Sequence, residues 1–179
     1  MSPTLKTKTP VKSKTAKSAA QADHPSLEGR KAPDFELLDR AGNKVALKDL
    51  LKDGNLVLYF YPRDMTPGCT TEACSFRDHA RQIRALDAQV AGISADSSAS
   101  HAKFAAKYEL KFPLLSDPEN RVTRAYGVYK KKSLYGREFM GIERSTFIID
   151  RAGTIRKVFA KVKVDGHSAE VLTVLKALG

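Results

Sequence analysis

An almost unbroken apolar run at residues 55–61 (Asn-Leu-Val-Leu-Tyr-Phe-Tyr) constrains the fold of this chain more than any other segment. Its length and its β-branched and aromatic content are typical of a strand that is covered on both faces. Pro62 ends the run, and a helical period follows that includes Phe76 and Ile83. Residues 89–94 predict a second buried strand. A strand–helix–strand order implies parallel pairing with a right-handed crossover.

The later part of the chain predicts an antiparallel hairpin and a closing helix. Residues 145–149 and 154–162 flank a four-residue turn in which Gly153 can adopt a positive φ. Residues 168–178 place their large aliphatic side chains on one helical face, and a further helix is expected at 99–108. The predicted fold class is therefore α/β, with a mixed central sheet flanked by helices.

Residues 1–29 differ in composition from the rest of the chain. They consist mainly of Lys, Thr, Ser, Ala and Pro, and they carry a net charge of +3 out of +11 for the whole chain. Such a segment buries too little apolar surface to offset its ordering entropy, so we expect a disordered basic tail, followed by one domain at residues 30–179. A solvated tail is the expected reading, and a weak nucleic-acid contact or a nuclear or organellar targeting signal are the alternatives.

The sequence contains no membrane or export signal that we can identify. No apolar run approaches the roughly 18 residues of a membrane span, and the start lacks the apolar stretch of a signal peptide. We therefore expect a cytoplasmic protein without membrane contact, in which the two cysteines form no permanent disulfide. Two cysteines are too few for a four-cysteine zinc site, and the four histidines are scattered, so no metal is expected. Each of the histidines, His24, His79, His101 and His167, is interpreted as an ordinary surface or capping residue.

Both cysteines follow the first buried strand, within residues 61–74. A lone cysteine is more often a small buried apolar residue, but the carboxyl ends of strands in open α/β sheets are where ligands bind. Cys69 would stand in the first turn of a helix, where unpaired N–H groups and the helix dipole stabilise a thiolate. Thr66 could donate a hydroxyl hydrogen bond to that sulfur or to a bound oxygen, and Pro62 could wall the pocket against water. Glu72 is a favourable first-turn acid that could also affect the charge on the sulfur.

The spacing of the cysteines distinguishes a catalytic pair from a structural one. If Cys69 and Cys74 lie on one α-helix, their Cα atoms are roughly 8.6 Å apart. A disulfide requires less than about 7 Å, so the bond would need the first helical turns to unwind. This geometry disfavours a permanent disulfide and favours a cycle in which the helix melts and forms again. It also differs from a C-x-x-C redox pair, which closes with little movement.

The pattern Pro-x-x-x-Thr-x-x-Cys, here Pro62, Thr66 and Cys69, resembles the active-site motif of peroxiredoxins. With Cys74 five positions after Cys69, the stretch at 59–78 looks like the Q-type branch, also called bacterioferritin comigratory proteins. The resemblance runs from about residue 27 to the C-terminus and includes the segment Arg-Ser-Thr-Phe-Ile-Ile-Asp that begins at Arg144.

The resemblance implies a thioredoxin-like fold and a thiol peroxidase that uses neither metal nor cofactor. Cys69 would be the peroxidatic nucleophile and Cys74 the resolving thiol, while Pro62, Thr66 and Arg144 would complete the pocket. A guanidinium stays charged and offers forked donors to a thiolate and a peroxide oxygen. Without the motif, Arg144 would be interpreted as a surface residue.

The implied reaction reduces hydrogen peroxide and organic hydroperoxides to water and alcohols, as an antioxidant defence. Cys69 passes through a sulfenic acid to an intramolecular Cys69–Cys74 disulfide. Thioredoxin or a similar dithiol donor would then reduce this bond, and a monomer is expected. Two other classes compete with this reading. A disulfide oxidoreductase on the same fold lacks its C-x-x-C motif here, and a nucleic-acid-binding protein lacks a recognisable reading motif in residues 30–179.

Overall fold

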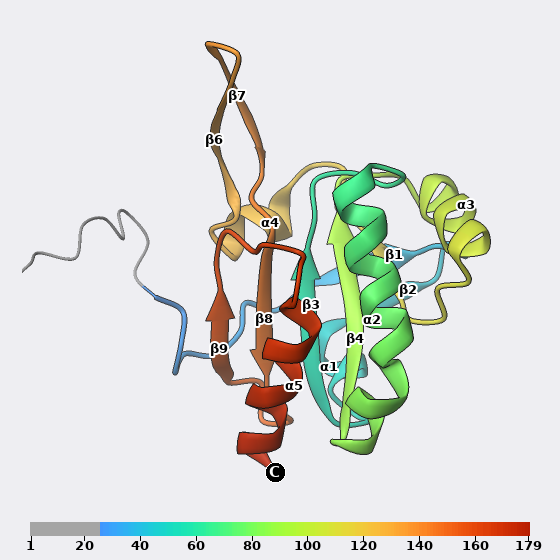
Figure 1. Cartoon of the computed structure of the whole chain (residues 1–179), viewed down its shortest axis with the longest axis vertical. Helices are drawn as coiled ribbons and strands as arrows, with labels where there is room; N and C mark the ends of the chain where they lie inside the picture. The colour runs from blue at the N-terminus through green and yellow to red at the C-terminus, as the bar shows by residue number, and fades with distance from the viewer. Residues whose placement is uncertain (1–25) are drawn as a thin grey trace, which may run out of the picture.

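The computed structural model describes residues 26–179 (Figure 1). The strands are β1 (Glu36–Asp39), β2 (Lys44–Ala46), β3 (Asn55–Phe60), β4 (Ala88–Ser94), β5 (Leu114–Ser116), β6 (Tyr129–Leu134), β7 (Arg137–Ile142), β8 (Ser145–Ile149) and β9 (Ile155–Phe159). The helices are α1 (Leu47–Leu50), α2 (Pro67–Ala85), α3 (Ser98–Tyr108), α4 (Arg121–Ala125) and α5 (His167–Leu178).

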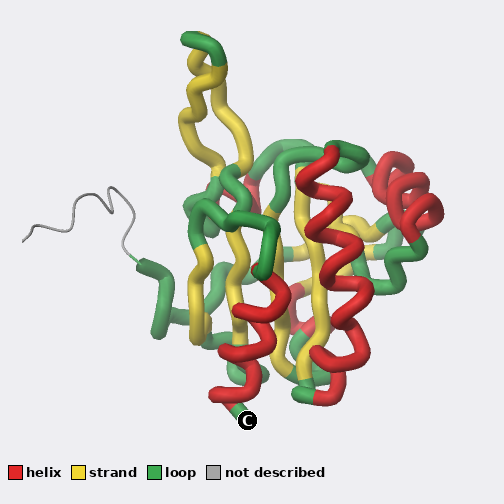
Figure 2. Tube along the Cα trace, viewed as in Figure 1, coloured by secondary structure: helices red, strands yellow, loops and turns green. Residues whose placement is uncertain are grey.

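The core of the described chain is a seven-stranded sheet in the order β2-β1-β5-β4-β3-β8-β9. Strands β3, β4 and β5 are parallel neighbours, whereas β8 pairs antiparallel with β3 and β9 pairs antiparallel with β8. Helices α2 and α5 lie side by side on one face of this sheet, as Figure 2 shows. The structure confirms the predicted α/β class with a mixed sheet flanked by helices, and also the β3–α2–β4 parallel unit.

Strand β3 is covered on both faces, as its continuous apolar sequence predicts. Its side chains alternate between two core clusters that lie on opposite faces of the sheet. One cluster contains Leu56, Leu58 and Phe60. The other contains Val57, Tyr59 and Tyr61, the residue directly after β3, together with residues of α2, α3 and α5. All six side chains are fully buried, so the end of β3 is a rigid base for the loop that follows it.

The predicted elements at the C-terminal end are present with small differences in length. The turn between β8 and β9 places Gly153 at φ 80°, and α5 begins one residue earlier than expected. The second strand of the hairpin was predicted to reach residue 162, but β9 ends at Phe159. The chain then leaves the sheet, and Val162 donates its N–H to the carbonyl of Arg144 (2.9 Å).

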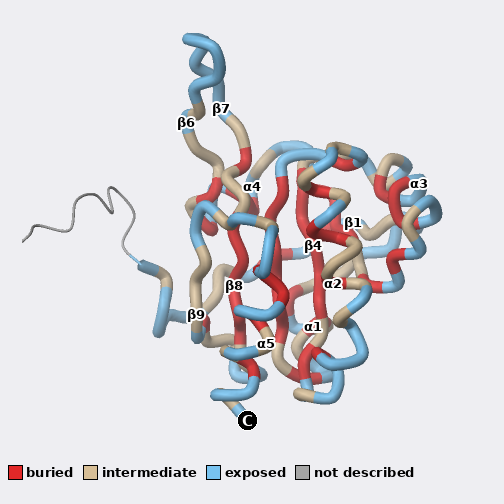
Figure 3. Tube along the Cα trace, in the orientation of Figure 1, coloured by how far each residue is buried: buried red, intermediate tan, exposed pale blue. Residues whose placement is uncertain are grey.

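A hairpin formed by β6 and β7 was not predicted. It makes a separate two-stranded sheet that projects from the domain, and its tip is exposed (Figures 1 and 3). Lysine occupies three successive positions of β6, and the large apolar side chains near the tip are exposed, with Tyr135 at 97%, whereas Ile142 at the base of β7 is buried. Because neither strand has one apolar face and one polar face, the sequence carries no period-two signal there.

The domain boundary lies slightly earlier than the sequence suggested. The predicted tail ended at residue 29, yet Leu27 packs against the core and the Glu28 carboxylate accepts a hydrogen bond from the Val158 N–H (2.9 Å). Gly29 donates its N–H to the Ile155 carbonyl (2.8 Å), so these residues lie along the edge strand β9. The rest of the predicted tail, residues 1–25, lies outside the described residues.

None of the helices between residues 26 and 179 combines the length and the apolar character that crossing a membrane would require.

Candidate active site

Helix α2 begins at the end of the loop that leaves β3. Thr66 is its N-cap residue with an extended backbone, and Pro67 occupies the first helical position, where its missing N–H costs no hydrogen bond. Both cysteines lie on this one continuous helix, which confirms the assumption behind the spacing argument. Cys69 is buried in the first turn, Cys74 is half-buried, and both are free thiols.

Arg144 is the charged group that reaches the Cys69 sulfur. It lies between β7 and β8, and its Nη2 donates to Cys69 Sγ at 3.3 Å. Gly68 makes this approach possible, because a Cβ atom added there would stand 3.1 Å from Arg144 Nη2. The structure therefore brings together a first-turn cysteine and a guanidinium that is 75 residues away in sequence.

Glu72 contributes more to this site than the sequence indicated. Its carboxylate is buried and forms an ion pair with Arg144 through Oε2, while Oε1 has no hydrogen-bond partner. Burial raises the pKa of Glu72 to about 7, against the opposing attraction of Arg144. The guanidinium thus stands between a thiol and a carboxyl group that is near its midpoint at neutral pH. The signal in the sequence was the position of Glu72 one turn after Cys69, but its burial could not be read from that spacing.

Two other predicted pocket residues occupy different environments from those expected. The Thr66 hydroxyl donates to the Arg63 carbonyl (2.9 Å) rather than to the sulfur, because Thr66 caps the helix in an extended conformation. Its oxygen can still accept a hydrogen bond. Pro62 is solvent-exposed, so it does not by itself exclude water from the sulfur. Cys69 is buried instead in a cluster that includes Tyr59 and Ala73.

The wall behind Cys69 is aromatic. Tyr59 stacks on Tyr61 with ring centroids 5.3 Å apart and packs on Phe76 of α2 at 5.0 Å. Burial raises the pKa of Tyr59 well above its ordinary value, and the negative charges of Glu72 and Cys69 add to the rise. The Tyr59 hydroxyl is buried without a hydrogen-bond partner. The wall is therefore a neutral, weakly hydrated surface, which strengthens the attraction between Arg144 and a thiolate.

Cys74 lies on the part of α2 that packs against α5. Its neighbour Ser75 forms a hydrogen bond with Ser168 of α5, and Phe76 packs edge-on against His167 with ring centroids 5.8 Å apart. Arg77 donates to the Tyr108 carbonyl at the end of α3 (2.8 Å). These contacts fix the helix around Cys74, so moving Cys74 toward Cys69 requires some of them to break.

Comparison with known proteins identifies the family. The model of the AhpC/TSA family matches residues 29–158. The chain is 52% identical to "Peroxiredoxin Bcp" of Bacillus subtilis over 148 residues, which cover 83% of this chain and 94% of that protein. It is 51% identical to "Putative peroxiredoxin bcp" of Coxiella burnetii over 144 residues, 80% of this chain and 95% of that protein.

Solved structures agree with these sequence relatives. The crystal structure of peroxidoxin BcpB from Mycobacterium tuberculosis superposes with a TM-score of 0.77 at 40% identity, covering 85% of this chain and 97% of that one. A bacterioferritin comigratory protein of Xanthomonas campestris, whose title names alkyl peroxide reduction activity, gives a TM-score of 0.75 at 40% identity. That match covers 80% of this chain and 90% of the X. campestris chain.

Proposed function

Since the chain belongs to the AhpC/TSA family, and within it to the Bcp or Q-type peroxiredoxins, we propose that Cys69 attacks the hydroperoxide and that Cys74 resolves the product. The family membership confirms the predicted thioredoxin-like fold and the predicted activity of a thiol peroxidase. The roles of individual residues are our proposal.

The observation that carries the proposal is the contact between Arg144 Nη2 and Cys69 Sγ at 3.3 Å, in the first turn of α2. The thiolate attacks one peroxide oxygen, so a sulfur–oxygen bond forms as the oxygen–oxygen bond breaks. The electron pair of the broken bond leaves with the second oxygen, which takes a proton and departs as water or an alcohol. Arg144 and the free N–H groups of the helix terminus stabilise the charge that develops on the oxygens. Thr66 can accept a hydrogen bond from the incoming peroxide.

Cys74 then attacks the sulfenic sulfur of Cys69, and water leaves as the disulfide forms. On the intact helix the two Cα atoms are roughly 8.6 Å apart, which exceeds the limit of about 7 Å for a disulfide. The first turns of α2 must therefore unwind during this step. A dithiol protein such as thioredoxin attacks the resulting disulfide and returns both cysteines to thiols.

We propose organic hydroperoxides as well as hydrogen peroxide as substrates. The alkyl peroxide reduction named for the X. campestris relative supports this range, as does the apolar and aromatic surrounding of Cys69. We further propose a cytoplasmic monomer with an antioxidant role. Contact between the basic N-terminal segment and nucleic acid would be weak and salt-dependent, and a gel-shift titration against salt concentration tests it.

A coupled assay tests the proposed roles of the cysteines. NADPH oxidation through thioredoxin reductase and thioredoxin is followed with hydrogen peroxide and with an organic hydroperoxide. Cys69→Ser abolishes turnover, because a hydroxyl is not appreciably ionised at neutral pH. Cys74→Ser reacts once with peroxide, accumulates a sulfenic acid that a trapping reagent labels, and does not turn over with thioredoxin. Substantial turnover by Cys69→Ser refutes its role, and full thioredoxin-dependent turnover by Cys74→Ser refutes that of Cys74.

A further inference from the structure

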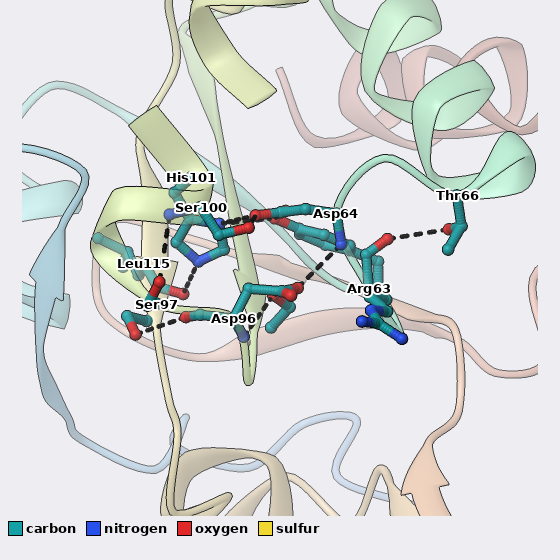
Figure 4. A network of polar contacts seen from close by, with 11 residues as sticks. Arg63, Asp64, Thr66, Asp96, Ser97, Ser100, His101 and Leu115 are labelled. Atoms are coloured by element: carbon teal, nitrogen blue, oxygen red, sulfur yellow. Dashed lines mark hydrogen bonds and ion pairs between the residues drawn. The ribbon is translucent and has the colours of Figure 1, made fainter. Parts of the chain in front are cut away.

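A buried polar cluster lies beside the loop that leads into α2, and the reaction described above does not use it. Asp64, in the middle of this loop, accepts hydrogen bonds from the Tyr61 hydroxyl (2.6 Å) and the Ser100 hydroxyl (2.7 Å). His101 Nδ1 is 2.8 Å from the same carboxylate. Figure 4 shows Asp64 pointing toward Ser100 and His101 of α3, which lie on the opposite side of the loop from the Thr66 side chain.

Both ring nitrogens of His101 have a partner in this cluster. Nε2 is 3.1 Å from the carbonyl oxygen of Leu115, and Nδ1 faces the Asp64 carboxylate. The His101 and Asp64 side chains are almost fully buried, so water does not compete for this contact. Burial by itself raises the pKa of Asp64, but the hydrogen bonds from His101, Tyr61 and Ser100 outweigh it and hold this pKa below its ordinary value.

The cluster holds the loop through its backbone as well. The Asp64 N–H donates to the Asp96 carboxylate (2.8 Å), and the Ser94 hydroxyl donates to the same carboxylate oxygen (2.6 Å). Asp64 is therefore fixed at its main chain by the end of β4 and at its side chain by α3. None of these anchors belongs to α2, so the loop can stay in place when the first turns of α2 unwind.

The residue that follows Asp64 shows why such anchoring is needed. Met65 has a left-handed backbone with φ 63°, although it is not a glycine and its side chain is 42% exposed. A non-glycine residue keeps this conformation only when its surroundings hold it there. The left-handed residue turns the chain so that Thr66 becomes the N-cap and Cys69 enters the first turn of the helix.

We propose that Asp64 and His101 are a positioning pair, which holds the left-handed turn at Met65 and thereby places Cys69 for attack on the hydroperoxide. The pair does not touch the reacting atoms, and this inference rests on the proposed function of Cys69. Because its anchors lie outside α2, the pair supports the peroxide step and not the resolving step, which needs α2 to unwind.

The test measures the two steps separately. Rapid quenching and mass spectrometry follow the oxidation of Cys69 by hydrogen peroxide in the Cys74→Ser background. In chains with both cysteines they follow the first-order conversion of the sulfenic acid into the disulfide. Asp64→Asn and His101→Gln each lower the second-order rate constant of oxidation at least tenfold, while disulfide formation is as fast as in the wild type or faster.

Asp117→Asn is the matched control. The Asp117 carboxylate is also buried, but it accepts hydrogen bonds from the N–H groups of Arg121 and Thr123 and none from residues of this loop. This substitution leaves both rates within twofold of the wild type.

Folding of each variant is checked by circular dichroism. If the single variants do not fold, the double variant Asp64→Asn/His101→Gln provides the test, because it removes the buried carboxylate together with its imidazole partner and keeps polar groups at both positions. Oxidation within twofold of the wild-type rate in a folded variant overturns the proposal, and so does equal slowing of both steps, which general loosening of the domain would produce. If the wild-type chain fails to react with peroxide, the proposed function and this inference are both overturned.

Discussion

Replacing Glu72 by glutamine changes how stability depends on pH, and the structure sets the size of the effect. Burial of Glu72 raises its pKa from 4.5 to about 7, so the native state holds this proton more tightly than the unfolded chain does. The proton stabilises the native state fully below pH 4.5. That contribution is lost as the pH rises from 4.5 to about 7, because the native state must then bury an ionised carboxylate.

The pKa of Glu72 differs by roughly 2.5 units between the native and unfolded states, which corresponds to a loss of about 3 kcal/mol in the free energy of unfolding between pH 4.5 and pH 7. Glutamine cannot ionise, so Glu72→Gln lacks this loss. Urea unfolding of the reduced wild type and the variant at a series of pH values from 4 to 8 measures the free energy of unfolding of each. The free energy of the variant relative to that of the wild type rises by about 3 kcal/mol across this window, since the titrations of other groups cancel in the difference.

The substitution Glu119→Gln provides the control, because it makes the same chemical change at a carboxylate that is exposed and paired with Arg121 at the surface. A constant difference between wild type and Glu72→Gln from pH 4 to pH 8 refutes the reasoning. It would mean that Arg144 compensates the burial of the carboxylate completely and that Glu72 has the same pKa in the native state as in the unfolded chain.

Three further outcomes follow from the same structure. Arg144→Met keeps the fold but slows the oxidation of Cys69 by roughly 100-fold in stopped-flow measurements, because the only guanidinium within hydrogen-bond distance of the sulfur among residues 26–179 is lost; an unchanged rate contradicts its role. Gly68→Ala slows the same step less, since the new Cβ pushes Arg144 aside by a few tenths of an ångström, and it leaves the melting temperature nearly unchanged. Deleting residues 1–25 alters neither activity nor melting temperature, whereas deleting residues 1–28 lowers the melting temperature because Leu27 and the Glu28 hydrogen bond are removed.

The fold was predictable where local sequence and burial agree. The apolar residues of β3 and the helical period of α2 both follow from packing against a single core, so their pattern is visible in the sequence. The β6–β7 hairpin was missed because its two strands pair with each other in a separate sheet and leave many of their side chains exposed. Such strands are stabilised by backbone pairing, which leaves no apolar period to read.

The candidate site was predictable to the extent that one segment carries it. Cys69, Cys74 and Thr66 are all on or beside α2, and helix geometry alone relates their positions. The partners of Arg144 and the role of Glu72 depend on how β8 pairs with β3, which brings distant segments together. The interpretation of the histidines as ordinary surface or capping residues was wrong for His101 and His167, which are both buried. Their partners, Asp64 and Thr146, lie 37 and 21 residues earlier in the chain, so the sequence around each histidine does not reveal them.

Amide hydrogen exchange on the reduced and the oxidised protein shows whether α2 unwinds, because it compares this helix before and after the Cys69–Cys74 disulfide forms. We predict faster exchange over residues 70–80 in the oxidised form, since the first turns of α2 must unwind and release Phe76 from Tyr59. Peptides from α3 serve as the internal reference and exchange equally in both forms. Equal protection over residues 70–80, with the disulfide verified by mass spectrometry, would contradict the account, because the bond would then have formed without unwinding the helix.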